Sequence, residues 1–404
     1  MRRLLTALGL LAACTPQTSP VLSGAAHCSA SPVSGTLARP ADALADTLGV
    51  ATFLHYTDTP YGTYASVAAQ LEALGVRHVR DSGARQESLP FLRSLEARGV
   101  RTLIQLDPSV DVHATAAACD GRGPGCTHAL ALQAALGSAL EGFQLPGTSL
   151  LIGTQSAEDA LSFARSVAAV APGVPRVAPF VEDDATAAAL SGLEPLTTQG
   201  ALFAPRWSNT TALEGVAEAE AWSARMSGSQ PRLAMAGVLG AGPEQEALQA
   251  RLLLVRWLES FTRGDTRFYV HELMDPNAMW TGGLSRLDGA PKPAFLALQR
   301  LMARVSEPGP AFTPGALEWS HAASPGLRSL VLRQRAGAFL LVLWRDVPEQ
   351  AGRVAVEIRT PLVRASLSRP LEARAPEELQ GSTFDVEVSD VTVLELEPPP
   401  CPPG

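Results

Sequence analysis

Polar and aromatic residues recur in this chain just after short apolar segments. Their types could bind or transform a small molecule, because carboxylates transfer protons or attack carbon, and flat aromatic rings stack on apolar faces. Tryptophan also brings a polar N–H, which suits the mixed polar and apolar face of a sugar ring. The substrate-binding candidates are Tyr56, Asp58, Arg80, Asp81, Gln105, Asp107, Arg206, Trp207, Glu272 and Trp280, with His55, His271 and Asp275 beside them.

A scaffold must bring these segment ends together, and the pattern of the chain predicts one. Eight short β-rich apolar segments alternate with segments of helical length from residue 49 onward. The predicted strands are Gly49–Tyr56, Val76–Asp81, Arg101–Asp107, Leu140–Pro146, Arg176–Val181, Ala201–Trp207, Arg232–Val238 and Arg267–Leu273. The predicted helices include Tyr64–Leu74, Ser88–Arg98, Ala157–Val170, Pro243–Thr262 and Lys292–Val305.

Eight such alternations with right-handed crossovers favour a (β/α)8 barrel of the α/β class. An open doubly wound sheet is the alternative, but no glycine-rich dinucleotide motif follows the first strand. Ligand chemistry in a barrel lies at the carboxyl ends of the strands, where the candidates above fall.

A second domain is expected after residue 306, where three prolines within seven residues end the helical pattern. Short alternating strands follow and predict a small antiparallel β-sandwich. These strands are Leu327–Arg333, Ala338–Trp344, Arg353–Ile358, Val363–Leu367 and Val386–Leu396. The expected division is a signal peptide at 1–13, an exported linker or extension at 14–47, the barrel at 48–306, the sandwich at 307–398 and a proline-rich tail at 399–404.

Composition limits the partners. The 404 residues are 46% apolar and 18% charged, which indicates a globular protein with a sizeable core. The formal net charge is −8, and no long basic run is present. A nucleic-acid partner is therefore not expected, and a neutral or weakly charged ligand fits better.

The N-terminus resembles an export signal. Arg2 and Arg3 precede an apolar run at 4–13 that is far shorter than the roughly 20 residues of a membrane-spanning helix. The run ends in Leu-Ala-Ala-Cys at Cys14, which resembles the bacterial lipobox, where the cysteine after the cleavage site carries lipid. This predicts a protein anchored in the bacterial cell envelope, in the periplasm or on the outer surface. A plain signal peptide with an incidental Cys14 is the alternative.

Four further cysteines would meet an oxidising compartment after export. They allow three pairings, of which Cys119 with Cys126 and Cys28 with Cys401 is the most economical. The first pair would close the glycine-rich segment CDGRGPGC, and the second would join the chain ends. Because His113 and His128 do not fall at zinc-finger spacing, no metal is expected. No cofactor is expected either.

Three stretches of the chain resemble clan A glycoside hydrolases, which are retaining enzymes. They are GVATFLHYTDTPYGTY at 49–64, LEALGVRHVRDSG at 71–83, and FYVHELMD at 268–275 followed by LSRLDGAPKPAFLALQRLM at 284–302. The resemblance runs from about Gly49 to Trp344. It implies a (β/α)8 barrel with a trailing β-sandwich, and an activity on glycosidic bonds.

Non-acidic residues stand at the two positions where the resemblance places the catalytic residues of that clan. A retaining glycosidase needs two carboxyl groups about 5 to 5.5 Å apart, which in this clan close strands four and seven. The resemblance places Thr148 at the acid/base position and Met235 at the nucleophile position. Thr148 has no useful acidity near neutral pH. Met235 cannot form a glycosyl intermediate. Glu272 resembles a position that supports the nucleophile.

Each remaining candidate also has a structural interpretation. Arg80 and Asp81 are adjacent, so their side chains point to opposite faces of the strand, and a buried ion pair at Arg80 is an alternative to ligand binding. His55 and His271 are expected to be hydrogen-bonded residues at strand ends. Glu141 is expected to solvate the barrel base, and the acids at 182–184 to cap a helix.

Two functions remain open. The first is a non-catalytic exported lipoprotein whose glycosidase-like barrel binds carbohydrate or serves as an envelope scaffold. The second is an active glycoside hydrolase in which displaced acids, such as Asp58, Glu272 or Asp275, act instead. The second would need a close carboxylate pair, one with a raised pKa.

Overall fold

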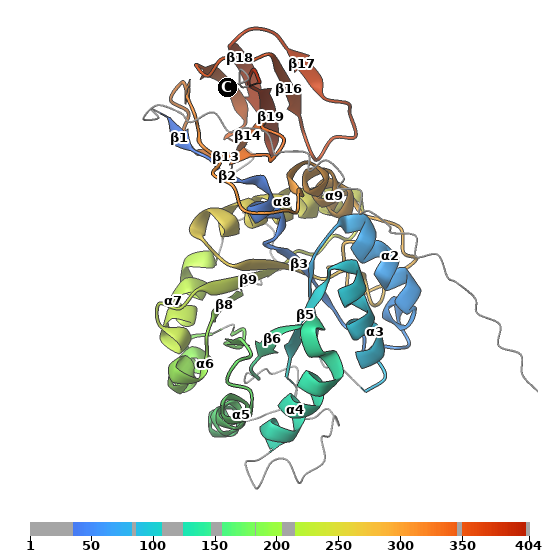
Figure 1. The fold of residues 1–404 in the computed structure, drawn as a ribbon. Coiled ribbons are helices and arrows are strands. Elements are labelled where there is room, and N and C mark those ends of the chain that lie inside the picture. The colour runs from blue at the N-terminus through green and yellow to red at the C-terminus, as the bar shows by residue number, and fades with distance from the viewer. Residues whose placement is uncertain are drawn as a thin grey trace, which may run out of the picture.

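A closed barrel of parallel strands forms the centre of the molecule (Figure 1). The computed structural model describes residues 35–82, 86–106, 124–146, 156–181, 183–203, 215–345 and 350–400. The eight strands lie in the order β7-β6-β5-β4-β3-β10-β9-β8. Their bounds are β3 Leu48–Thr52, β4 His78–Ser82, β5 Arg101–Gln105, β6 Leu140–Gln144, β7 Arg176–Val177, β8 Gly200–Phe203, β9 Arg232–Gly237 and β10 Arg267–His271.

The first and last strands of that order, β7 and β8, also meet, which closes the sheet. Val177 pairs with Gln199 in parallel, and the amide of Ala178 donates to the carbonyl of Gln199 at 2.9 Å. The predicted barrel is therefore confirmed, and the doubly wound alternative is wrong. Each predicted strand overlaps an observed one, although most end two to four residues earlier than predicted.

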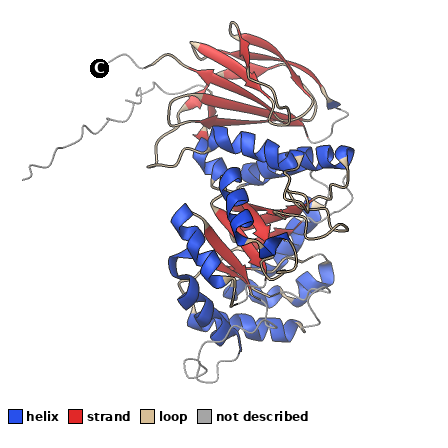
Figure 2. Cartoon of the chain, turned by 90° about the vertical axis from the view of Figure 1, so that its right-hand side faces the viewer, coloured by secondary structure: helices blue, strands red, loops and turns tan. Residues whose placement is uncertain are grey.

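Helices surround the barrel (Figures 1 and 2). Two of them match the predicted bounds: α2 (Tyr64–Leu74), which ends at Gly75 with a left-handed φ of 75°, and α5 (Ala157–Val170), which begins with a capping box between Ser156 and Asp159. The others are α1 Ala41–Ala45, α3 Leu89–Ser94, α4 Pro124–Leu136, α6 Asp184–Ala189, α7 Val216–Ser227, α8 Pro243–Arg263 and α9 Pro293–Val305. Short 3-10 turns lie at Pro60–Gly62, Leu95–Arg98, Gly137–Ala139 and Ser191–Leu196.

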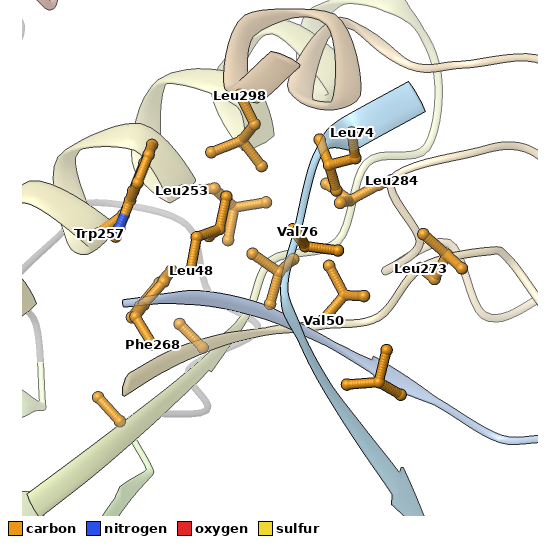
Figure 3. Close-up of a cluster of buried hydrophobic side chains, with 14 of the residues drawn as sticks. Leu48, Val50, Leu74, Val76, Leu253, Trp257, Phe268, Leu273, Leu284 and Leu298 are labelled. Atoms are coloured by element: carbon orange, nitrogen blue, oxygen red, sulfur yellow. The ribbon is translucent and has the colours of Figure 1, made fainter. Parts of the chain in front are cut away.

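The main core lies between the barrel and the long helices α8 and α9. Figure 3 shows Leu48 and Phe268 from neighbouring strands facing Leu253 and Trp257 of α8. The indole of Trp257 donates to the Thr47 hydroxyl at 3.0 Å, which satisfies its polar group inside the apolar layer. This packing holds β3 and β10, the first and last barrel strands along the chain, against α8 and α9.

The barrel interior is a separate apolar cluster. It contains Ala51, Leu103, Val177, Ala178, Ala201, Phe203, Leu233, Met235 and Tyr269. Tyr269 fills the space opposite Gly49, where an added Cβ would lie 2.6 Å from the tyrosine ring. The centre of the barrel is therefore packed, and ligands of such barrels bind at the carboxyl ends of the strands.

Antiparallel strands form a second layer above α8 and α9 (Figures 1 and 2). One sheet has the order β17-β16-β19-β14-β13-β2 and the other β12-β15-β18. Their bounds are β2 Arg39–Pro40, β12 Trp319–His321, β13 Leu327–Arg333, β14 Phe339–Arg345, β15 Gly352–Ile358, β16 Arg364–Ser368, β17 Glu377–Leu379, β18 Thr383–Val388 and β19 Thr392–Glu397. The predicted β-sandwich is confirmed.

Two features of the sandwich differ from the prediction. The segment at 386–396 is two strands, β18 and β19, because the chain turns between Val388 and Thr392. In addition, the segment expected as a linker at 14–47 contributes to this layer, since β2 pairs with β13 and β1 (Thr36–Leu37) pairs with β11 (Ala316–Leu317). Strands of two residues carry no readable alternation, so the sequence offered no signal for them.

A buried carboxylate joins the sandwich to the barrel. Glu259 of α8 accepts from the Trp344 indole at 2.9 Å and from Arg328 Nε at 3.0 Å. Nearby, Arg251 of α8 pairs with Asp390 at 3.0 Å. Trp344 and its sheet neighbours also belong to the core cluster of the barrel helices. The two layers therefore share one continuous core.

We expect Glu259→Ala to lower the free energy of unfolding by about 2 to 3 kcal/mol, because it leaves a buried indole N–H and a guanidinium without their acceptor. Urea unfolding monitored by circular dichroism measures the change. Glu378→Ala, which removes an exposed partner of Arg364 on the sandwich, is the matched control and should leave the midpoint unchanged. Equal midpoints for wild type and Glu259→Ala would contradict this role.

Candidate functional site

The described candidates gather around the carboxyl end of the barrel, with Arg80 at the centre. Arg80 is the middle residue of β4, points into the barrel beside Ala51 and Leu103, and is only 4% exposed. Its Nε donates to Gln144 Oε1 at 2.6 Å, and its Nη2 donates to Gln105 Oε1. Its Cζ lies 5.3 Å from the centre of the Phe180 ring. Burial lowers the pKa of Arg80 to about 10, so the group stays charged at neutral pH.

Asp81 points the other way, as the alternation along the strand predicts. Its Oδ2 accepts from the Thr52 hydroxyl at 2.7 Å and from the amide of Leu54 at 3.2 Å. Burial raises the pKa of Asp81 to about 6. The carboxylate therefore fixes the start of the loop after β3, and makes no ion pair with Arg80 among the described residues.

Aromatic side chains form one wall of the mouth. Phe53 stacks on Tyr56 with ring centres 5.8 Å apart, and it meets His271 edge to face at 5.1 Å. His271 in turn meets Trp280 edge to face at 5.9 Å. Tyr56 is 43% exposed, so part of this wall faces solvent. Desolvation lowers the pKa of His271, which keeps its imidazole neutral.

Glu272 lies behind the aromatic wall. The Tyr61 hydroxyl lies 2.8 Å from Glu272 Oε2 and 3.1 Å from the carbonyl of Met274, while it accepts from the Met274 amide at 3.0 Å. The indole of Trp280 also donates to the Glu272 carboxyl. Burial raises the pKa of Glu272 to about 8, so the group is protonated at neutral pH. The Tyr61 hydroxyl has one proton to donate. If Glu272 is protonated, Glu272 can donate to the Tyr61 oxygen while Tyr61 donates to the Met274 carbonyl, so both contacts are hydrogen bonds.

Asp275 forms an ion pair with the buried Lys292. Lys292 Nζ lies 2.8 Å from Asp275 Oδ2 and also donates to the carbonyl of Thr281 at 2.9 Å. Asp275 Oδ1 accepts from the amide of Gly283 at 2.8 Å. A shallow pocket of about 400 Å³ lies beside this pair, between the loops that follow β9 and β10. The contacts of Asp275 hold the loop after β10 in place.

The ends of the fourth and seventh barrel strands carry neutral side chains. Met235 of β9 belongs to the interior cluster, 4% exposed, and pairs in register with Phe203 and Tyr269. The next inward position, Gly237, has no side chain, so a register shift of two residues would not supply an acid. In β6 the last residue is Gln144, which is bonded to Arg80.

Several predicted residues lie outside the described residues: Thr148, Asp107, Arg206, Trp207, Cys14, Cys28, Cys119 and Cys401. Cys126 is buried in α4. Asp58 lies on an exposed turn after β3. The described residues contain no cluster of three or more His, Cys, Asp or Glu side chains suited to a metal ion. No helix within the described ranges combines the length and hydrophobicity of a membrane span.

The predicted cap by Asp183 is confirmed, and Glu141 lies at the barrel base as predicted, although it is a largely buried ion-pair partner there and does not serve as a solvating group. Glu141 lies at the amino-terminal end of the barrel, where its carboxylate is 2.8 Å from His78 Nδ1 and accepts from Arg267 Nε at 2.9 Å. Asp183 caps α6 by accepting from the Thr186 amide at 2.8 Å. Neither residue contributes to the mouth.

Solved structures of glycoside hydrolases share this architecture. A family 39 glycoside hydrolase from Bacteroides cellulosilyticus WH2 superposes with a TM-score of 0.60 at 12% identity, covering 89% of this chain and 81% of that one. A monomeric β-xylosidase from Caulobacter crescentus CB15 gives 0.57 at 14% identity, with 90% and 98% covered. A GH39 enzyme from Xanthomonas axonopodis pv. citri gives 0.55 at 13% identity, with 90% and 96% covered.

The chain has the fold of the clan A glycoside hydrolases. Neither family models nor curated proteins match its sequence. At these identities the likeness establishes the glycosidase-like barrel and its trailing sandwich, and leaves the activity to be argued from the site.

Sequence reasoning missed four residues that shape the glycosidase-like mouth: Phe53, Tyr61, Gln144 and Lys292. Gln144 had a readable signal, because alternation from Gly142 makes it the inward residue that closes its strand. Phe53, one residue past the end of β3, likewise continues the inward alternation from Ala51. Tyr61 and Lys292 had none, since each reaches its carboxylate partner across a loop whose path the sequence does not specify.

The protonation of Glu272 predicts a pH-dependent stability. In the unfolded chain a Glu ionises near its ordinary pKa of about 4.3, whereas the folded protein holds the proton up to about 8, so stability falls as pH rises through this window. Glu272→Gln keeps a neutral side chain of the same shape. Between pH 5 and 8 we expect the variant to lose less free energy of unfolding than wild type, by about 1 to 3 kcal/mol.

Urea unfolding at pH 5, 6.5 and 8 measures this difference. Glu96→Gln, at an exposed position of the 3-10 turn after α3, is the matched control and should follow the wild-type profile. Parallel profiles for wild type and Glu272→Gln would show that Glu272 is ionised in the folded protein.

Proposed function

We propose that this chain is an exported lipoprotein whose glycosidase-like barrel binds a carbohydrate at its mouth and does not cleave it. The observation that carries the proposal is Met235, an apolar side chain on the inward face near the end of the seventh strand. A retaining mechanism requires a carboxylate that attacks the sugar from about that place. A thioether cannot form a stable glycosyl intermediate.

Binding is supported by the aromatic wall. Tyr56 and Phe53 stack on each other, and Trp280 continues the wall behind His271. Flat rings with polar edges match the alternating apolar faces and hydroxyl edges of a sugar ring. The solved structures with this fold are glycoside hydrolases, among them a β-xylosidase, which fits a carbohydrate ligand.

The alternative of an active hydrolase using displaced acids has less support. Asp275 is ion-paired with Lys292, and Asp58 lies on an exposed turn. Glu272 has the raised pKa of a proton donor, but its carboxyl group is already bound by Tyr61 and Trp280. Among the described residues, no second carboxylate at the mouth remains to act as nucleophile.

A glycan-binding screen on the mature chain, followed by calorimetry on the best ligand, tests the proposal. Trp280→Ala should weaken binding about tenfold, because it removes roughly 1 to 1.5 kcal/mol of aromatic contact. Trp280→Phe should keep most of the affinity, since a ring remains. Trp319→Ala, the same substitution on the sandwich, is the matched control and should bind like wild type.

The recovered glycan should be intact, and a broad panel of aryl glycosides should give no release. Turnover that Glu272→Gln abolishes would contradict the non-catalytic proposal. Binding that is lost in Trp319→Ala and kept in Trp280→Ala would place the ligand on the sandwich instead of the barrel mouth.

The proposed anchor rests on the N-terminal sequence, where a short apolar run leads directly to Cys14. We expect metabolic labelling with a radioactive fatty acid to mark the full-length protein in a bacterial host, and Cys14→Ser to abolish the label. Cys126→Ser is the control that removes a different cysteine. Equal labelling of the wild type and Cys14→Ser would contradict lipidation at this residue.

A further inference from the structure

We propose that the carbohydrate bound at the mouth is acidic, and that Arg80 binds its carboxylate. The inference rests on the proposed function and names the chemical class of its ligand. Arg80 carries a buried charge that forms no ion pair with any residue that the structure describes. Arg80 is almost completely buried, yet its two hydrogen-bond partners, Gln105 and Gln144, are neutral amides. Its sequence neighbour Asp81 is bound to Thr52 and Leu54 on the other face of the strand.

The guanidinium keeps donors for a ligand. It has five N–H groups, and the described contacts use one on Nε and one on Nη2. Nη1 has no hydrogen-bond partner among the described residues. The Nη1 and Nη2 groups together form the end of the guanidinium, which binds both oxygens of a planar carboxylate. The two glutamines therefore fix the side chain in a position that leaves Nη1 and one N–H of Nη2 without a partner among the described residues.

The apolar surroundings of Arg80 favour binding of an anionic ligand over a neutral one. Phe180 lies against the guanidinium, and the interior cluster with Met235 packs below the mouth. Charge interactions are stronger in such apolar surroundings than in water. A neutral glycan would displace water from Arg80 and leave its charge uncompensated, whereas a carboxylate would neutralise it. A planar carboxylate also matches the fork better than a tetrahedral sulfate does.

Calorimetry with uronate oligosaccharides tests the inference on the wild-type chain. The probes are oligomers of galacturonate, glucuronate and mannuronate, each beside its methyl ester, with neutral and sulfated oligosaccharides in parallel. We expect at least one acid to bind ten times or more as tightly as its ester. This comparison needs no substitution, so it does not depend on a variant that folds.

The substitution Gln144→Glu places a protein carboxylate beside the Arg80 guanidinium. The new carboxylate would occupy the place of the amide that accepts from Arg80 Nε, with nearly the same shape. We expect the ratio of the affinity for the acid to the affinity for its ester to fall at least tenfold. Gln380→Glu adds the same charge at an exposed position of the sandwich and should keep the wild-type preference.

The outcomes separate the two proposals. Three results would overturn the role of Arg80 and leave carbohydrate binding standing. They are equal binding of acid and ester, a preference for sulfated or neutral oligosaccharides, and an unchanged preference for the acid in Gln144→Glu. No binding to any oligosaccharide would overturn the proposed function and this inference together.

Discussion

The desolvated guanidinium of Arg80, held by two amides at the carboxyl end of the barrel, is the interaction around which the mouth is arranged. A buried charge requires compensation, and a protein usually supplies it with a carboxylate. Here the inward residues of the described strands supply amides, apolar groups and aromatic rings instead. Arg80 also keeps Gln105 and Gln144 oriented, since each amide oxygen accepts from it. The geometry of three neighbouring strands therefore depends on this one side chain.

The acids that remain near the mouth have structural partners. Asp81 fixes the loop after the first barrel strand, Asp275 neutralises Lys292, and Glu272 is a neutral hydrogen-bonding group under the aromatic wall. Each of these carboxyl groups is hydrogen-bonded within the protein, whereas a catalytic acid must contact the substrate. The described part of the mouth thus combines aromatic rings with hydrogen-bonding groups, and the last residues of β6 and β9, Gln144 and Gly237, carry no charge.

Periodicity identified the fold well because the elements are long enough to show it. Helices α2 and α5 carry clear boundaries in their sequence, a left-handed Gly75 and a capping box at Ser156. Strands β1 and β2, of two residues each, could not be seen. They exist because distant strands of the sandwich offer them partners.

The site was harder to predict than the scaffold. Alternation correctly separated Arg80 from Asp81, but it could not tell which of them faced the barrel, because that depends on the register of the whole strand. Gln144 has no acidic group that would mark it in the sequence, and its role is defined by its contact with Arg80. Residues that act through a partner become visible only when the fold places the two together.

A crystal structure of the mature protein grown with an acidic oligosaccharide tests the account most directly, because it shows the ligand and the complete mouth at once. The account predicts an unbroken sugar chain at the aromatic wall, a sugar carboxylate on the Arg80 guanidinium, and no second side-chain carboxyl group facing the ligand from across the mouth. Two protein carboxyl groups about 5 to 5.5 Å apart on either side of a glycosidic bond would contradict it, since that arrangement belongs to a retaining hydrolase.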